Sequence, residues 1–171
     1  ALDFSSLRPR DRWSFLERCL AALAARLQAK TVLGEYVRRI EELSHLLTHS
    51  SSLVRPSLAF AERLAADAPL VPEVYADEPH RFSQEPYRRK LFLMRARLLR
   101  NLERLRAAID GHEAPVAAGY ASERDFLADL YAIRDSLHSH GDGNLADAEL
   151  KDLIRLAESF GFYLAQLDIR Q

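Results

Sequence analysis

Apolar residues recur at three- and four-residue steps through most of this chain, and no other feature constrains its fold as strongly. This spacing places apolar side chains on one side of an α-helix. One such segment runs from Arg12 to Gln28 and a second from Thr31 to Thr48. Their apolar positions are Trp13, Leu16, Leu20, Leu23 and Leu27 in the first, and Val32, Tyr36, Val37, Ile40, Leu43 and Leu47 in the second. The sequence therefore predicts two amphipathic helices, and Gly34 weakens the second by about 1 kcal/mol relative to alanine.

Serine and proline then interrupt the helical pattern. The stretch THSSSLVRP should form a loop, because serines compete for backbone hydrogen bonds and Pro56 disfavours helical geometry at Arg55. Pro56 suits the first turn of a short helix from Ser57 to Ala66. The stretch APLVPEVYADEPHRFSQEP contains four prolines. We expect it to be extended or made of short turns.

The strongest helical pattern begins after Pro86, and Gly111 suits the left-handed position that follows a helix. A polar connection follows, and Ser122 suits the N-cap of a further helix that ends near His138. The apolar positions of these two helices are Leu91, Met94, Leu98, Leu102, Leu105 and Ile109, and then Phe126, Leu127, Leu130, Ile133 and Leu137. Both segments therefore carry a continuous apolar face.

A last helix is expected from Ala148 to about Leu164, after the turn-rich stretch HGDGNLAD. Residues 164–169 alone have the pattern of a β-strand, and this candidate strand has no partner within the chain, which would leave its backbone groups unpaired. We therefore predict a mainly α fold of about six helices with one barrel-type strand at residues 164–169. The missing sheet neighbours, and the absence of an initial Met, lead us to expect an internal fragment of a larger protein.

Composition narrows the classes of function. The chain has 171 residues, of which 48% are hydrophobic and 29% charged, as in a globular domain with a real core. A net charge of -1 gives no global field toward nucleic acid or membranes, and no apolar run is long enough to span a bilayer. The single cysteine, Cys19, excludes an internal disulfide and fits a reducing compartment such as the cytoplasm.

Two histidine patterns raise the question of a metal site. His138, His140 and Asp142 form H-x-H-x-D at a helix end, but all three lie in one glycine-flanked turn, whereas zinc sites draw ligands from two elements. We expect them to be surface capping residues. His45 and His49 share a helix face but lack the adjacent glutamate of a zinc protease, so we expect solvated helix residues there as well.

The helix after Pro86 is strongly basic, with Arg88, Arg89, Lys90, Arg95, Arg97, Arg100, Arg104 and Arg106. The simpler interpretation is a solvated face paired with acidic residues. The alternative is an anion or phosphate-ester site at the helix start, where backbone N–H groups favour negative charge. A nucleic-acid site is disfavoured because aromatic residues do not interleave with these charges.

Asp168 and Arg170 end the candidate strand. Residues two apart in a strand face the same side, so these polar groups point together while Leu167 and Ile169 point to the other face. In an α/β barrel, active-site groups emerge at the C-terminal ends of strands. The pattern therefore favours a catalytic position for this pair.

The end of the chain resembles a known family. FGFYLAQLDIRQ is similar to the segment of phosphoenolpyruvate carboxylases in which a helix leads through FG into a barrel strand ending in DIRQ. Upstream, EPYRRKL resembles the EPYR helix start of the family, and DLYAIRDSLHSHGDGNLADAELKDLIR resembles its stretch with IADG. Residues 56–171 match well, and residues 1–55 only as a helical region. One departure is the sequence Ala146-Asp147-Ala148, where many members have ADG.

The resemblance implies that the whole of residues 1–171 is one helical segment of an enzyme that converts phosphoenolpyruvate and bicarbonate to oxaloacetate and phosphate with Mg²⁺ or Mn²⁺. It implies that Arg170 binds the phosphate or carboxyphosphate. Arg88 matches an arginine of an activating sugar-phosphate site in some members. The catalytic histidine, the FHGRGG loop, the catalytic lysine and the metal ligands of the family lie outside this sequence, so the segment alone should be inactive. The resemblance also implies a homotetrameric parent enzyme.

Two other interpretations stay open from the sequence. A free-standing helical module could bind a partner through its apolar faces, and it predicts a stop codon directly after Gln171. A regulatory helical bundle could bind an anion, and it predicts saturable sugar-phosphate binding that depends on Arg88. The fragment hypothesis instead predicts that the reading frame continues, beginning with Glu-Ser.

Overall fold

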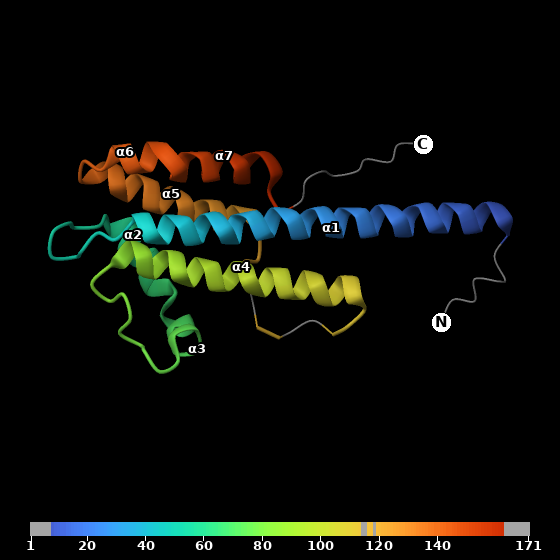
Figure 1. The fold of residues 1–171 in the computed structure, drawn as a ribbon, viewed down its shortest axis with the longest axis horizontal. Coiled ribbons are helices and arrows are strands. Elements are labelled where there is room, and N and C mark those ends of the chain that lie inside the picture. Colours follow the sequence, from blue (N-terminus) through green and yellow to red (C-terminus); the bar gives the residue numbers. More distant parts are fainter. Residues whose placement is uncertain (1–7, 114–115, 118, 163–171) are drawn as a thin grey trace.

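The computed structural model describes residues 8–113, 116–117 and 119–162, and within these ranges the chain is helical with no β-strand (Figure 1). The α-helices are α1 (Pro9–Leu46), α2 (Leu58–Ala66), α3 (Val71–Tyr75), α4 (Pro86–Asp110), α5 (Glu123–Ser139), α6 (Gly143–Leu145) and α7 (Lys151–Phe160). A 3₁₀ turn, η2 (Ala68–Leu70), precedes α3, and a π-helical turn, η3 (Ala146–Leu150), precedes α7. The predicted mainly α class is confirmed. None of the described helices has the length and apolar character needed to cross a membrane.

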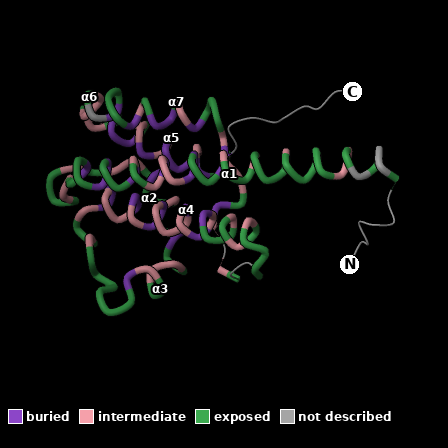
Figure 2. The backbone as a smooth tube through the Cα atoms, turned by 45° about the vertical axis from the view of Figure 1, so that its right-hand side comes forward, coloured by how far each residue is buried: buried purple, intermediate pink, exposed green. Residues whose placement is uncertain are grey.

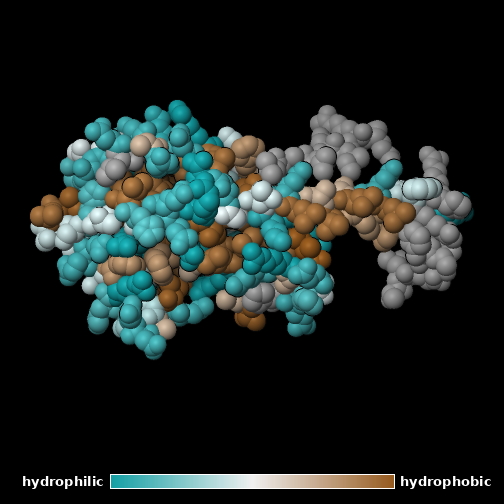
Figure 3. Space-filling model, in the orientation of Figure 1, coloured by the Kyte–Doolittle hydropathy of each residue, from teal (hydrophilic) through white to brown (hydrophobic). Residues whose placement is uncertain are grey.

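The two helices expected between Arg12 and Thr48 are one helix, α1, of 38 residues. The prediction of a break near residue 29 was wrong because Gln28, Ala29 and Lys30 are good helix formers and no capping residue interrupts them. The join is also supported from outside, since the Arg26 guanidinium donates to the Ala108 carbonyl at the end of α4 over 3.0 Å. The N-terminal half of α1 extends past the other helices (Figure 1), is largely exposed (Figure 2) and carries apolar side chains on its surface (Figure 3).

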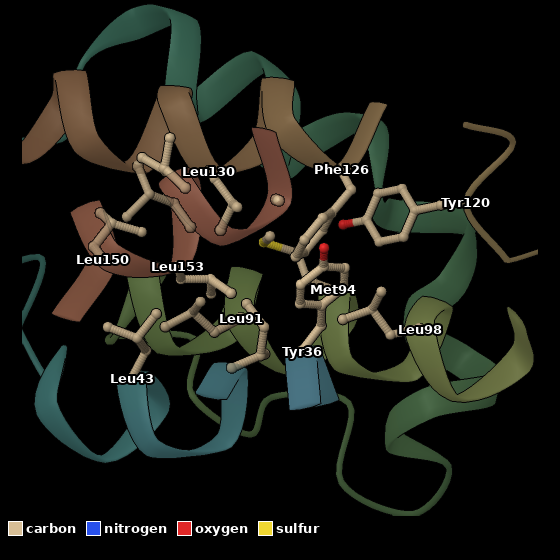
Figure 4. Packing of buried hydrophobic residues seen from close by; sticks show 14 of the residues in the cluster. Tyr36, Leu43, Leu91, Met94, Leu98, Tyr120, Phe126, Leu130, Leu150 and Leu153 are labelled. Atoms are coloured by element: carbon tan, nitrogen blue, oxygen red, sulfur yellow. The ribbon is translucent and has the colours of Figure 1, made fainter. Parts of the chain in front are cut away.

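The core lies between the C-terminal half of α1 and helices α4, α5 and α7. Figure 4 shows Tyr36 of α1 facing Phe126 of α5, whose ring centroids lie 5.3 Å apart, with Met94 and Leu98 of α4 beside them. The fully buried members of this core include Tyr36, Ile40, Phe60, Tyr87, Leu91, Met94, Leu98, Phe126, Leu130, Ile133, Leu137, Leu150 and Leu153. These residues occupy the apolar positions that the periodicity predicted for α4 and α5, and for α1 from Val32 onward.

Caps set where the middle helices begin and end. The Ser57 hydroxyl accepts a hydrogen bond from the Phe60 N–H, so Ser57 is the N-cap of α2 and Pro56 lies outside the helix rather than in its first turn. Ser122 caps α5 by accepting from the Asp125 N–H, as predicted. Gly111 ends α4 with a φ of 73°, the left-handed geometry expected there. The proline-rich stretch forms the short turns η2 and α3 before an irregular loop.

The last helix is shorter than predicted. It spans Lys151–Phe160, because Ala148 has a non-helical backbone within η3 and Gly161 takes a φ of 54° that ends the helix. The Tyr36 hydroxyl donates to the Gly161 carbonyl over 2.6 Å and so fixes the exit of α7 against α1. The candidate strand at residues 164–169 lies outside the described residues.

Gly119 allows the connection after α4 to approach that helix closely. A Cβ at this position would lie 2.0 Å from Asn101 Oδ1 and 2.7 Å from the Arg97 carbonyl oxygen. The Asn101 amide needs this approach, because it accepts from the Tyr120 N–H and donates to the Tyr120 carbonyl.

We predict that Gly119→Ala lowers the free energy of unfolding by about 1–3 kcal/mol, since the added methyl must displace backbone or break the Asn101 clamp. Gly34→Ala is the matched control. A Cβ at Gly34 meets nothing within 4 Å, and alanine in a helix interior is about 0.5–1 kcal/mol more stable than glycine. Urea unfolding followed by circular dichroism measures both changes. Equal effects of the two substitutions would contradict the packing described for Gly119.

Candidate functional site

Lys90, on the basic helix α4, is fully buried. Its ammonium lies 2.6 Å from Asp67 Oδ2, at the end of α2, and 2.9 Å from Asp129 Oδ1 on α5. All three side chains are 1–2% exposed. An ammonium in the interior requires such partners, because an uncompensated buried charge is strongly unfavourable. The expectation that this basic face is solvated is therefore wrong at Lys90.

Two arginines and a tyrosine complete this charge cluster. Arg97 lies 2.5 Å from Asp67 Oδ1, and Arg63 donates to Asp129 Oδ1 over 2.7 Å. The Tyr120 hydroxyl donates to Asp129 Oδ2 over 2.8 Å. Burial, and then the neighbouring Asp129 charge, raise the pKa of Tyr120 well above its ordinary value of 10.0. Each carboxylate is thus contacted by at least two cations, so the cluster joins α2, α4 and α5 as a structural unit.

The other arginines of α4 that have described ion pairs bind nearby acidic residues, largely as the simpler interpretation predicted. Arg95 pairs with Glu41 at 3.3 Å, and Arg100 pairs with Glu73 at 2.5 Å. Arg100 departs from the expected solvated face, because its side chain is only 9% exposed. These pairs hold α1 and α3 against α4.

Arg88, predicted at an activating anion site, lies in the first turn of α4. Its guanidinium is 3.1 Å from Glu85 Oε2 and 4.3 Å from the centroid of the Phe82 ring. The neighbouring Arg89 donates to the carbonyls of Arg81 and Pro79. In this arrangement the two arginines hold the proline-rich loop against the start of α4. A sugar-phosphate role for Arg88 stays a prediction.

The structure brings together one member of each histidine pattern, and the sequence did not predict this. His49 Nε2 lies 3.2 Å from Asp142 Oδ2, and His140 Nδ1 lies 3.0 Å from the same oxygen. Both imidazoles are mostly buried, with 15% and 12% of the side chain exposed. His49 follows the end of α1 instead of lying on it. The predictions of a solvated His49 and of a surface His140 were therefore wrong, whereas His138 is more exposed and lies 3.6 Å from Asp147.

Tyr87 connects this histidine pair to the core. Its hydroxyl lies 2.7 Å from His140 Nε2 and 2.6 Å from Ser136 Oγ, and Ser136 in turn accepts from the Ser57 N–H. The start of α4, the end of α5 and the loop before α2 are thereby linked. Among the described residues, no group of three or more His, Cys, Asp or Glu side chains is arranged to hold a metal ion. The described part of the chain therefore does not fit a resident divalent metal.

Arg170 and Asp168, predicted as active-site residues, lie outside the described residues. Phe162, the last described residue, packs against Tyr36 and Phe126 at ring-centroid distances of 6.5 and 6.2 Å. The chain that leads to Arg170 therefore leaves the helical bundle from a fixed point between α1 and α5.

The fold and these positions agree with known proteins. A family model for phosphoenolpyruvate carboxylase matches residues 10–171. The phosphoenolpyruvate carboxylase of Rhodopseudomonas palustris (strain HaA2) is 42% identical over 147 residues, which are 85% of this chain and 15% of that protein. Those of Roseiflexus castenholzii and Nitrosomonas europaea are 38% and 33% identical, covering 86% and 95% of this chain but 16% and 17% of their own lengths.

These matches assign the chain to the carboxylase class of lyases. It belongs to the phosphoenolpyruvate carboxylase family, and it spans about a sixth of the length of the curated relatives it matches. The resemblance carried by the EPYR, ADA and DIRQ segments is thereby confirmed at the level of the family.

We predict that Lys90→Met lowers the free energy of unfolding by about 3 kcal/mol, because two buried carboxylates lose a shared cation. The matched control is Arg38→Met, which removes a cation from exposed pairs with Glu35 and Glu42. That variant should unfold close to the wild type, since exposed pairs contribute little. Chemical denaturation measures both, and a Lys90→Met protein as stable as the control would refute the structural role of the cluster.

A second prediction concerns alkaline pH. The folded pKa of Tyr120 is raised above its unfolded value, so protonated Tyr120 contributes stability that is present below about pH 10 and lost as the pH rises further. In Tyr120→Phe the free energy of unfolding should fall less steeply above about pH 10 than in the wild type, by up to about 1.4 kcal/mol per pH unit. Urea titrations at a series of pH values test this. Parallel pH profiles for the two proteins would contradict it.

Proposed function

We propose that this chain forms a helical segment of a phosphoenolpyruvate carboxylase, which produces oxaloacetate and inorganic phosphate from phosphoenolpyruvate and bicarbonate. The observation that supports the proposal is the family match over residues 10–171, combined with 33–42% identity to three carboxylases over most of the chain. In this reaction bicarbonate attacks the phosphate group, carboxyphosphate and an enolate form, and the enolate captures CO₂. Negative charge develops on phosphate and enolate oxygens, so cationic side chains that bind these oxygens accelerate the reaction.

Arg170 is the residue of this chain to which we assign a direct role. A guanidinium presents paired N–H donors that match two phosphate oxygens, and it keeps its charge at any physiological pH. The role of the helices is to position the segment that carries Arg170. Support for this comes from the Tyr36 hydroxyl bound to the Gly161 carbonyl and from the contacts of Phe162 with Tyr36 and Phe126. Each of these contacts lies within ten residues of Arg170 in the sequence.

The remaining parts of the proposal concern the whole enzyme. Mg²⁺ or Mn²⁺ would supply charge neutralisation for phosphate and enolate, and its ligands would come from outside the described residues, which provide no suitable group. We assign the enzyme to the cytoplasm, where the single exposed thiol of Cys19 would stay reduced. A homotetrameric enzyme and anaplerotic carbon fixation belong to the same proposal.

A second candidate function is a helical interaction module, and one observation favours it. The N-terminal half of α1 presents large apolar side chains to solvent, among them Trp13 at 69% and Leu20 at 66% exposed. Such a patch is typical of a binding surface. The two functions are compatible, because a segment of a large enzyme also needs surfaces that contact other polypeptide.

The proposal predicts that residues 1–171 alone form no oxaloacetate in a bicarbonate-dependent assay coupled to malate dehydrogenase. Grafted in place of the matching segment of the Rhodopseudomonas palustris enzyme, the same residues should restore activity. In that graft Arg170→Ala should lower kcat by at least about a hundredfold, the scale for losing one charge-stabilising group. Arg155→Ala, which removes a largely exposed guanidinium on α7, is the control and should retain activity. An inactive graft that is folded, or an active Arg170→Ala graft, would refute the assignment.

A further inference from the structure

Five large apolar side chains on the N-terminal half of α1 are exposed together. We call them the α1 stripe: Trp13, Leu16, Leu20, Leu23 and Leu27. Their exposed fractions run from 38% for Leu16 to 69% for Trp13. Figure 3 shows hydrophobic surface along this part of the helix, and Figure 2 shows that most of its residues are exposed. A contiguous apolar patch of this kind marks an interaction site, whereas isolated exposed leucines are ordinary.

The α1 stripe faces away from the helical bundle. An α-helix turns by about 100° per residue, so Leu20 and Ile40, twenty residues apart, differ in direction by about 200°. Ile40 points into the core and is fully buried. Leu20 therefore points to nearly the opposite side of the same straight helix. No rearrangement of α4, α5 or α7 on their own side of α1 would cover the stripe, so its partner comes from elsewhere.

The spacing within the α1 stripe indicates a helical partner. The intervals between the five residues are three, four, three and four, which is the a/d pattern of a coiled-coil seam. Such a narrow seam fits one packed helix better than a sheet or a membrane surface, which would require a wider apolar face. The partner surface is therefore an α-helix with the same regular apolar spacing.

Charges lie off the seam. Between Trp13 and Leu27 the charged residues are Glu17, Arg18 and Arg26. Arg18 lies about 160° around the helix from Leu20, and Arg26 is turned toward the Ala108 carbonyl of α4. Glu17 lies at the edge of the stripe, about 60° from Leu20. A second helix can therefore contact the stripe without burying a charge or opposing two arginines.

We propose that the α1 stripe docks against the α1 stripe of a second copy of this chain. A seam with alternating three- and four-residue intervals meshes with itself, and a two-fold axis applies the same patch to both copies. The geometry leaves room for this pairing. The arm extends beyond the other helices (Figure 1), and the stripe lies opposite the bundle, so two arms meet with the bundles on the outer sides. The inference is independent of the proposed catalytic function.

Sedimentation equilibrium of the chain from about 1 µM to about 1 mM tests the proposal, because this range brackets weak and moderate association. The wild type should reach twice the mass of one chain. Leu20→Gln should raise the dissociation constant at least about tenfold, as expected for a central residue of an interface. The matched control is Leu53→Gln, which changes a leucine that is 86% exposed but lies in the loop after α1. The control should dimerise like the wild type.

The single tryptophan gives a second readout, since Trp13 is part of the stripe. Its emission should shift to shorter wavelength as the wild type is concentrated, and this shift should be absent in Leu20→Gln. Far-ultraviolet circular dichroism establishes that each variant is folded, and Leu23→Gln serves if Leu20→Gln is not. A wild type that stays monomeric at the highest concentration overturns the proposal and leaves the stripe to a different protein. Dimers that persist in both stripe variants, or that are lost equally in Leu53→Gln, also overturn it.

Discussion

The buried ammonium of Lys90 is the constraint on which the arrangement of the bundle depends. It sits where α2, α4 and α5 meet, and it is tolerated there only because Asp67 and Asp129 approach it within hydrogen-bonding distance. Each helix must therefore adopt the register that places its charged residue at this point. Apolar contacts around Leu91, Leu98 and Phe126 tolerate small shifts between helices, whereas an ion cluster in the interior does not.

Much of the fold could be predicted from residue spacing and capping. The apolar faces of α4 and α5, the cap at Ser122 and the stop at Gly111 follow from local rules, and all are present. The continuity of α1 could not be predicted in the same way. Its apolar face changes sides midway, and the pattern therefore looked like two short helices. Packing against α4 holds the join in place, and that contact involves residues some eighty positions apart.

The polar sites were less accessible to sequence reasoning because they depend on tertiary proximity. Lys90 follows Tyr87 by three positions and precedes Met94 by four, so its place on the buried face was readable, but its partners on α2 and α5 were not. The histidine patterns were each judged within one segment, and the structure instead pairs His49 with His140 around Asp142. The resemblance identified the family correctly. The residue it implicates most directly, Arg170, lies beyond the described part of the chain.

The uninterrupted course of α1 makes it a rigid lever. At about 1.5 Å per residue its 38 residues extend for about 57 Å, with the stripe near one end and Tyr36 beyond the middle. Tyr36 grips the Gly161 carbonyl, from which the chain proceeds toward Arg170. Any force that twists or tilts the exposed arm is therefore delivered to the exit of α7 with no intervening hinge. Contacts made at the tip of the arm and the orientation of the chain that leaves the bundle are mechanically one variable.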